Sequence, residues 1–307
     1  MEKNGPTIVA LGEVLWDVFP DARLLGGAPL NFAVHAKNLG ADAHIVSRIG
    51  TDDLGDKIAQ AVHGFGLSLD TVQRDPKRPT GRVNVTLDLQ GRPTFEIVKD
   101  VAWDAIEETP EAQALVARAE AVCFGTLAQR SARSRTAIQN LLARAGSARL
   151  RVCDINFRQR FYTLPIVTAS LKIANVLKLN EDELPVLLKL LKIGGKASAS
   201  RAEVVALMKG FELDVVCVTL GERGAILHTA EGEIHSPGYR VKVADTVGSG
   251  DAFTAGLVVK LLAGAPHAEA LDFANLVGAY VATQPGATPA LDEKVLSAFA
   301  QGLDRTG

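Results

Sequence analysis

Residues 176–191 read VLKLNEDELPVLLKLL, and this stretch contains the pattern that decides the fold. The short and almost continuously apolar run at 176–180 predicts a strand that is buried on both faces of a sheet. An acidic helix start and an apolar helical pattern follow directly at 181–191. A strand that leads straight into a helix is the repeating unit of a parallel α/β sheet.

The same unit recurs along most of the chain. Further strand-like runs lie at 7–11, 43–49, 121–125, 151–155 and 215–220. Helical patterns lie between or after them, at 29–39, 53–62, 112–119, 133–145, 201–208, 251–283 (with a break near 264–266) and 291–300. This alternation predicts a doubly wound α/β sandwich, and the lack of internal repeats or a linker predicts a single domain over 1–307.

Residues 80–98 break this rhythm. Apolar residues alternate with polar ones on both sides of Gln90-Gly91-Arg92, as in a hairpin, at Val83, Val85, Leu87, Leu89, Phe95 and Ile97. With residues 14–24, we interpret this hairpin as a small β lid beside the main sheet; the alternative is an edge hairpin of the main sheet. An exposed apolar face on that lid would favour a homodimer formed through it. A second hairpin, over 225–228 and 233–236, is expected at the sheet edge.

Composition excludes several classes of function. The 307 residues are 47% hydrophobic and 22% charged with a net charge of −2, so nucleic acid or an anionic membrane is not expected as a partner. No apolar run reaches the about 18 residues of a spanning helix, and no signal-peptide pattern is found, so we expect a cytoplasmic protein. Cys123, Cys153 and Cys217 lie in apolar runs and are expected to be reduced core residues.

The strongest local motif is DTVGSGDAF at 245–253. Two glycines and a serine lead into a helix start, where unpaired N–H groups and the helix dipole form an anion cradle. No Lys-Ser/Thr pair follows, so this is not a nucleotide P-loop. Asp251 lies at the mouth of the cradle, where the simpler interpretation is a helix cap. A carboxylate beside an anion hole could instead accept the proton of a hydroxyl that attacks a phosphoryl group.

Residues 245–256 resemble the carboxy-terminal signature of the ribokinase-like (phosphofructokinase B type) carbohydrate kinases. Residues 26–33 (GGAPLNFA) and 49–55 resemble the amino-terminal signature, in the right order, and the resemblance extends from about 9 to 289. It implies a Rossmann-like three-layer α/β/α sandwich with a β-sheet lid. It also implies a kinase that uses ATP and Mg²⁺ to phosphorylate a small-molecule sugar.

The resemblance assigns roles around the acceptor. The residue that matches Asp251 is the general base, and the backbone at Gly248, Ser249 and Gly250 is the anion hole. Asp17 matches the acidic residue that binds sugar hydroxyls; without the resemblance it could be an exposed turn residue. The substrate-binding loop and the helix after it are matched by Gly26, Gly27 and Asn31, which could otherwise form a plain strand-to-helix turn.

The residues Asp154-Ile155-Asn156-Phe157-Arg158 follow a predicted strand, at the sheet end where ligands bind. They resemble the Asp-x-Asn-x-Arg of the fructokinase and ketodeoxygluconate kinase branches, so Asn156 and Arg158 are substrate candidates; the alternative is a structural network. Trp103 in Ala102-Trp103-Asp104 resembles the fructokinase branch and could equally be a core residue at the lid hinge. That branch phosphorylates D-fructose to fructose 6-phosphate; 2-keto-3-deoxygluconate, ribose and nucleosides are the other acceptors considered.

Further resemblances concern the nucleotide and metal ions. Asn180 and Glu183 match an Asn-x-x-Glu motif that positions phosphates and Mg²⁺, the latter through water. Residues that match the nucleotide loop and the helix against the adenine are Thr219, Gly221, Gly224 and Asn275, although a helical position can also be plain packing. Asp245 and Gly286 match a monovalent-cation (K⁺) site, but Gln284-Pro285 stands where members often have a basic residue.

Two other classes of function fit the same fold less well. A non-catalytic sugar- or nucleotide-binding protein on the same fold would not need the Gly248–Asp251 cluster, which is intact here. A dehydrogenase would need G-x-G-x-x-G after its first strand, and the first strand-helix region lacks it. An ATP-dependent sugar kinase, with fructokinase as the closest branch, is therefore the prediction.

Overall fold

The computed structural model describes residues 5–87, 93–194 and 200–306. Its centre is a nine-stranded sheet with the order β13-β12-β11-β10-β9-β8-β1-β4-β5. The strands from β11 to β5 in this order are parallel, and β12 and β13 add an antiparallel hairpin at the edge. The bounds are β1 (Thr7–Leu11), β4 (Asp42–Gly50), β5 (Val72–Asp75), β8 (Ala121–Phe124), β9 (Leu150–Asp154), β10 (Val176–Asn180), β11 (Val215–Thr219), β12 (Ala225–Thr229) and β13 (Gly232–Ser236).

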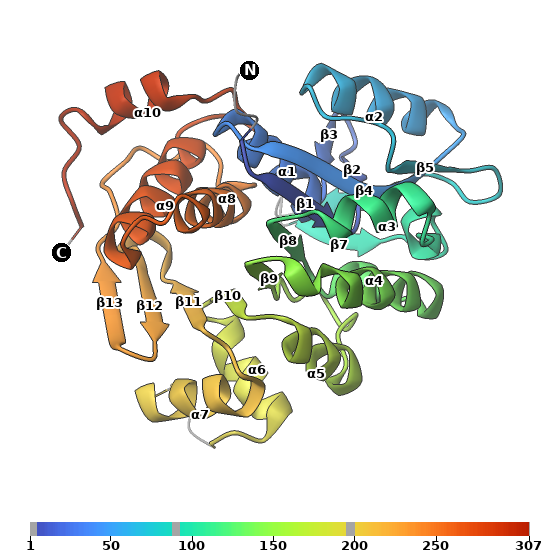
Figure 1. Cartoon of the computed structure of the whole chain (residues 1–307). Helices are drawn as coiled ribbons and strands as arrows, with labels where there is room; N and C mark the ends of the chain where they lie inside the picture. Colours follow the sequence, from blue (N-terminus) through green and yellow to red (C-terminus); the bar gives the residue numbers. More distant parts are fainter. Residues whose placement is uncertain (1–4, 88–92, 195–199, 307) are drawn as a thin grey trace.

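Helices cover both faces of this sheet, which gives three layers. Along β1, Ile8 and Ala10 pack into one apolar cluster while Val9 and Leu11 pack into another, as the alternation of a strand dictates. Figure 1 shows α8 and α9 on one side of the strands and α4 and α5 on the other. The first cluster includes α1 (Ala28–Asn38), α2 (Asp53–Gly64), α8 (Ser249–Leu262) and α9 (His267–Ala282), and the second includes α3 (Pro110–Ala117), α4 (Ala132–Arg144), α5 (Leu164–Ile173), α6 (Glu183–Leu191) and α7 (Arg201–Phe211). Helix α10 (Glu293–Ala300) packs on α9.

The lid is a second, separate sheet of four strands. It consists of β2 (Leu15–Val18), β3 (Arg23–Gly26), β6 (Gly81–Leu87) and β7 (Pro93–Ile97) in the order β3-β2-β6-β7. The lid interpretation is therefore correct, and the alternative of an edge hairpin on the main sheet is wrong. The expected turn at 90–92 lies outside the described residues.

Most of the apolar face of the lid hairpin is packed and not exposed, because Val83, Val85 and Ile97 are buried, whereas Phe95, opposite Val85, is exposed. Val83 and Val85 are buried in the same cluster as the main-sheet residues Val9 and Leu11, which contradicts the exposed face expected from the sequence. In the described lid strands, the exposed large apolar side chains are those of Leu24 and Phe95. The homodimer through the lid stays a prediction.

Two elements were missed in the sequence. Strand β5 reads VQRD, which is too polar to be recognised as a strand, because it forms the edge of the sheet. Helix α5 is short, and its start depends on Thr163, whose side chain accepts the N–H of Ile166. The three cysteines are buried and free, as expected. Within the described residues, no helix combines the length and the apolar character that crossing a membrane requires.

Candidate active site

Helix α8 begins at a tightly constrained turn. Gly248 precedes the helix with φ 77°, and a Cβ placed there would lie 2.4 Å from the carbonyl oxygen of Ala287. Only glycine fits this conformation and this space. The Ser249 hydroxyl donates to Gly278 O at 2.9 Å and so fixes the helix start against α9. The first intrahelical bond runs from Ala252 N to Gly248 O, and the Ser249 N–H donates to Thr246 O at 3.3 Å. Among the described residues, the N–H groups of Gly250 and Asp251 have no backbone partner, as an anion cradle requires.

Asp251 stands in this first turn and faces a helix from the other end of the chain. Asn31 on α1 donates its side-chain N–H to Asp251 Oδ2 at 2.8 Å. Burial, and then the charge of Asp154, raise the pKa of Asp251 to about 6, against the lowering effects of Asn31, Lys178 and Arg158. Within the described ranges, no hydrogen bond joins this carboxylate to its own helix, so it is not acting as a cap. A carboxylate with a pKa near 6 suits a general base at neutral pH.

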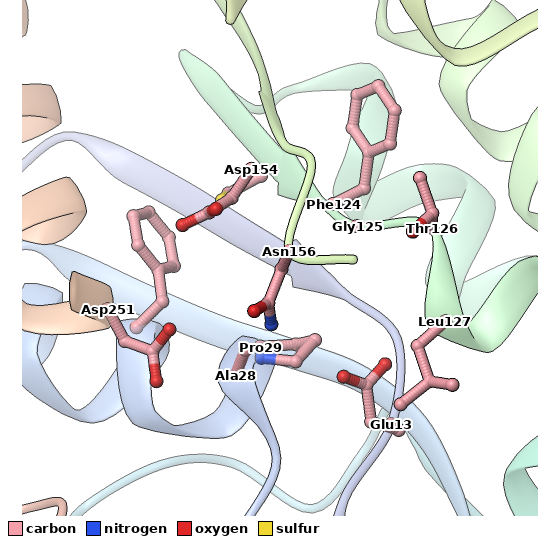
Figure 2. A pocket seen from close by; sticks show the side chains of 12 residues that line it. Glu13, Ala28, Pro29, Phe124, Gly125, Thr126, Leu127, Asp154, Asn156 and Asp251 are labelled. Carbon is pink, nitrogen blue, oxygen red and sulfur yellow. The ribbon is translucent and has the colours of Figure 1, made fainter. Parts of the chain in front are cut away.

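Asp251 lines a small pocket between α1, α8 and the ends of β1, β8 and β9. Figure 2 shows Asp251, Asn156 and Glu13 directed towards the same space. The pocket also depends on Gly27, where φ is 112° and a Cβ would lie 2.5 Å from Glu13 O. Glycine at this position lets the start of α1 pack closely against Glu13 in the segment after β1. This close packing places Asn31 of α1 beside Asp251.

Asp17 and Arg158 belong to the same electrostatic environment. Asp17 lies on lid strand β2, and burial raises the pKa of its carboxyl while Arg158 lowers it. Arg158 also lowers the pKa of Asp251 and of Glu13, so its guanidinium acts on the whole pocket. Gly26 crosses close to Asp17, because a Cβ there would lie 2.9 Å from Asp17 Oδ2. The fold thus brings the predicted acceptor residues of the lid, α1, β9 and α8 together.

A buried ion pair that the sequence analysis missed lies behind the first turn of α8. Lys178 Nζ lies 3.1 Å from Asp154 Oδ2, and both side chains are almost fully buried. The Thr254 hydroxyl lies 3.0 Å from Asp154 Oδ2 and 2.9 Å from Gly250 O. The pair therefore anchors the anion cradle to strands β9 and β10. Its signal in the sequence is a lysine in the middle of an otherwise apolar buried strand.

A larger groove lies on the other side of the first turn of α8. Its volume of about 580 Å³ falls in the range of ~300–1,000 Å³ typical of ligand pockets. The predicted nucleotide residues that line it are Asn180, Thr219, Gly221, Gly224 and Asn275, together with Ser249 and Gly250 of the cradle. Gly224 has φ 93° and a Cβ there would meet Ser236 O at 2.1 Å, so this turn also requires glycine. Asn275 donates to Ser236 O at 3.1 Å, which also gives it the packing role considered as the alternative.

Glu183 is buried and holds two strand-end loops together. Its carboxylate accepts the N–H of Phe157 at 2.8 Å and that of Asn180 at 2.9 Å, and burial raises its pKa. Within the described part of the chain, no three or more His, Cys, Asp or Glu side chains gather as a ready metal site. The role of Glu183 towards Mg²⁺ stays a prediction, and its visible role is structural.

Trp103 is fully buried in the core and lines none of the described pockets. The guanidinium of Arg130 lies 3.9 Å from its ring centre, and Asp104 holds Arg130 through an ion pair at 2.8 Å. The substrate contact predicted for Trp103 is therefore not found, because its indole packs beneath the lid. The core interpretation, left open from the sequence, is the one the structure favours.

The two segments expected at a cation site are adjacent. Asp245 Oδ2 accepts the N–H of Gly286 at 3.2 Å, and its Oδ1 accepts that of Val247 at 3.0 Å. The same loop presents Ala287 O to Gly248, so it supports the cradle from behind. Cation binding at this place stays a prediction.

Comparisons with known proteins agree with this geometry. The model described as "pfkB family carbohydrate kinase" matches residues 21–294. The chain is 28% identical over 316 residues to the probable fructokinase-5 of Arabidopsis thaliana, with 94% of this chain and 95% of that protein covered.

Two solved structures have a similar fold. Fructokinase from Xylella fastidiosa with bound ATP matches with a TM-score of 0.86 at 23% identity, over 96% of this chain and 98% of that one. Fructokinase from Vibrio cholerae O395 in its fructose, ADP and calcium ion bound form matches with a TM-score of 0.82 at 25% identity, over 97% and 100% of the two chains. The predicted ribokinase-like fold class is confirmed.

Proposed function

The chain belongs to the pfkB family of carbohydrate kinases, and from this premise we propose that it is an ATP-dependent fructokinase that converts D-fructose to fructose 6-phosphate. The family resemblance predicted from the sequence is thereby confirmed, and a sugar kinase is its coarse function.

One observation carries the proposal: neighbouring residues of α8 serve two different pockets. Asp251 lines the small pocket, while Ser249 and Gly250 line the large groove. An acceptor in the first and a nucleotide in the second would meet at the helix start. A phosphoryl transfer needs this meeting point, together with a base and an anion hole.

In the proposed reaction, a hydroxyl of the sugar lies beside Asp251, whose carboxylate takes the proton as the oxygen attacks. The first-turn N–H groups of α8 hold the charge that develops on the transferred group. Asn31 orients the Asp251 carboxylate through its 2.8 Å hydrogen bond. Asp17, Asn156 and Arg158 are proposed to hold the sugar from the lid and from the end of β9.

The groove fits a bound nucleotide. Gly221 and Gly224 line it with positive φ, and because glycine has no side chain, their backbone can approach a ligand closely. ATP with Mg²⁺ would supply the phosphoryl group and neutralise the phosphate charge. Glu183 is proposed to meet Mg²⁺ through water: each of its oxygens accepts one N–H and keeps a lone pair that can accept from a metal-bound water. A K⁺ ion beside Asp245 and Gly286 would support the cradle through their shared loop.

Fructose is favoured by the names of the relatives, and the pattern after β9 agrees with fructose as well as with the keto acid. The Arabidopsis and V. cholerae relatives are named fructokinases, and the second was solved with fructose bound. In this chain Asp154, Asn156 and Arg158 follow the Asp-x-Asn-x-Arg pattern, and Asn156 lines the small pocket with Asp251. Ribose is left as a weaker alternative within the same class.

A second acceptor, 2-keto-3-deoxygluconate, is favoured by Arg158. Its side chain is exposed, and no ion pair within the described residues satisfies its charge. Its guanidinium donates within hydrogen-bond distance only to the adjacent Phe157 O, at 3.3 Å. A free guanidinium beside the pocket could bind the carboxylate of a sugar acid.

An acceptor screen separates these candidates. At fixed ATP and Mg²⁺, D-fructose should give the highest kcat/KM among fructose, 2-keto-3-deoxygluconate, ribose and a nucleoside, and the product should be fructose 6-phosphate by NMR. The Asp251→Asn variant, purified in parallel, controls for contaminating kinases. Preference for the keto acid would replace fructose by the second candidate, and binding without turnover of any sugar would favour a non-catalytic binding protein.

The value of kcat/KM should fall at low pH. Asp251 acts as a base only when ionised, and its pKa is about 6. With sugar subsaturating and nucleotide saturating, kcat/KM should therefore level off above that pH and fall about tenfold per pH unit below it. Circular dichroism at each pH checks that the protein stays folded. A flat profile down to pH 5 would contradict the assignment of the base.

A further inference from the structure

Glu13 is a buried carboxyl group that takes no part in the proposed proton transfer or anion cradle. It lies in the link between β1 and lid strand β2, and its side chain is 4% exposed. Oε2 is buried and has no hydrogen-bond partner. The side chain nevertheless lines the pocket that contains Asp251 and Asn156, and Figure 2 shows its carboxyl directed into that space.

The two other carboxylates that line the pocket are paired with side chains from other elements, whereas the carboxyl of Glu13 bonds only its own backbone and leaves Oε2 without a partner. Asp251 accepts from Asn31, and Asp154 is paired with Lys178. A buried polar atom without a partner destabilises a folded protein, so such an atom calls for a partner outside the chain, such as a ligand or a bound water. Here the space in front of the unpaired oxygen is the proposed acceptor pocket, and a ligand there would satisfy it.

We propose that Glu13 is a specificity-determining residue whose carboxyl forms a hydrogen bond with a hydroxyl group of the bound sugar, from the wall of the pocket that faces Asp251. This inference rests on the proposed function, because it needs the pocket to hold a sugar. It adds a contact from the β1–β2 link to those from α1, β9 and the lid.

The charge state of Glu13 suits this role. Burial is the main cause that raises its pKa to about 7, against the lowering effects of a hydrogen bond from its own backbone N–H and of Arg158 and Arg130; the charge of Asp251 raises it further. Near neutral pH the group therefore carries its proton for much of the time. A carboxylic acid both donates and accepts, and so does a sugar hydroxyl, whereas an ionised carboxylate only accepts.

A double-mutant cycle with deoxy sugars tests the contact. Glu13→Leu removes the hydrogen bond at similar size, and Glu13→Gln keeps one donor and one acceptor. By calorimetry, Glu13→Leu should bind the best acceptor of the screen about 10–100-fold more weakly than the wild type, and Glu13→Gln much less so. One monodeoxy analogue should be bound equally by Glu13→Leu and the wild type, because the hydroxyl that Glu13 contacts is missing from it.

A stability measurement tests Glu13 without any sugar. Ionisation of Glu13 is disfavoured in the folded protein, so its penalty develops as pH rises from 4.5 to about 7. Glu13→Gln should therefore match the wild-type Tm near pH 4.5 and exceed it by about 2–6 °C near pH 8. Glu120→Gln, at an exposed position on the same domain, is the matched control and should show no such difference.

The two measurements separate the outcomes. A stabilised Glu13→Gln together with selective loss of affinity in Glu13→Leu supports the inference. Variants that are destabilised at every pH would make Glu13 a structural residue, and unchanged affinity with every analogue would remove it from the sugar site. If the wild type phosphorylates no sugar, the proposed function fails, and the Tm comparison alone then decides whether Glu13 is a ligand-facing or a structural group.

Discussion

Replacing Asp251 by asparagine should lower kcat by about 10³-fold or more, the scale seen when a general base is removed. Asparagine keeps the size of the side chain and can still accept from Asn31, which donates at 2.8 Å in the wild type. The sugar should therefore still bind, with a Kd within a few-fold of the wild type by calorimetry. The effect should lie in the chemical step, which single-turnover rates at saturating substrates measure.

The same variant should be more stable than the wild type, which separates lost catalysis from lost folding. The pKa of Asp251 is raised to about 6 in the folded protein. A raised carboxyl pKa means stability that is present at low pH and is lost as pH rises through that value. Near pH 8 the free energy of unfolding should increase by about 1–2 kcal/mol, less than the full shift implies because Asp251 lines the pocket at intermediate exposure, where water can reach its carboxyl. Wild-type turnover, or a variant that is less stable near pH 8, would contradict the assignment.

Replacing Lys178 by methionine should be the most destabilising single change proposed here. It leaves Asp154 buried with its charge unpaired, and breaking a buried pair costs about 3–5 kcal/mol. Adding Asp154→Leu should restore much of this loss, since two apolar residues can replace a buried pair. Urea unfolding of the two single variants and the double variant measures the coupling between them.

A surface pair gives the matched control for this cycle. Lys260 lies 3.2 Å from Glu269 on the exposed side of α8, and Lys260→Met should cost less than about 1 kcal/mol. Lys178→Met should in addition shift the pH profile of the rate upward, because Lys178 lowers the pKa of Asp251. Equal costs for Lys178→Met and Lys260→Met would mean that the Lys178–Asp154 pair does not anchor the cradle.

The sequence predicted best the features that are local in the chain. Strands and helices follow from apolar periodicity, and the turn at 245–253 is visible because it needs glycine at Gly248. The lid could be separated from the sheet because its alternation differs from that of doubly buried strands. These features depend on neighbours within a few residues.

Features that depend on distant partners were harder to predict. Trp103 resembled a substrate residue, but the indole is covered by Arg130, which is 27 positions further along the chain. The lid face at Val83 and Val85 is buried because the main domain covers it, which no local pattern shows. The sequence signal of Glu13 and Lys178 is weak, because each is only a charged residue next to or within a buried strand. Their roles depend on distant partners: Lys178 pairs with Asp154, and Glu13 lies in the electrostatic field of Asp251.

The connection between β1 and the lid has a consequence for affinity. Strand β1 ends at Leu11 and lid strand β2 begins at Leu15, so only three residues separate Asp17's strand from the rigid sheet, while Asp251 stays on α8. Any hinge motion of the lid must carry Asp17 relative to Asp251. If the lid closes on the acceptor about this link, the measured dissociation constant includes the free energy of closure, and a substitution in the link weakens binding without touching the ligand.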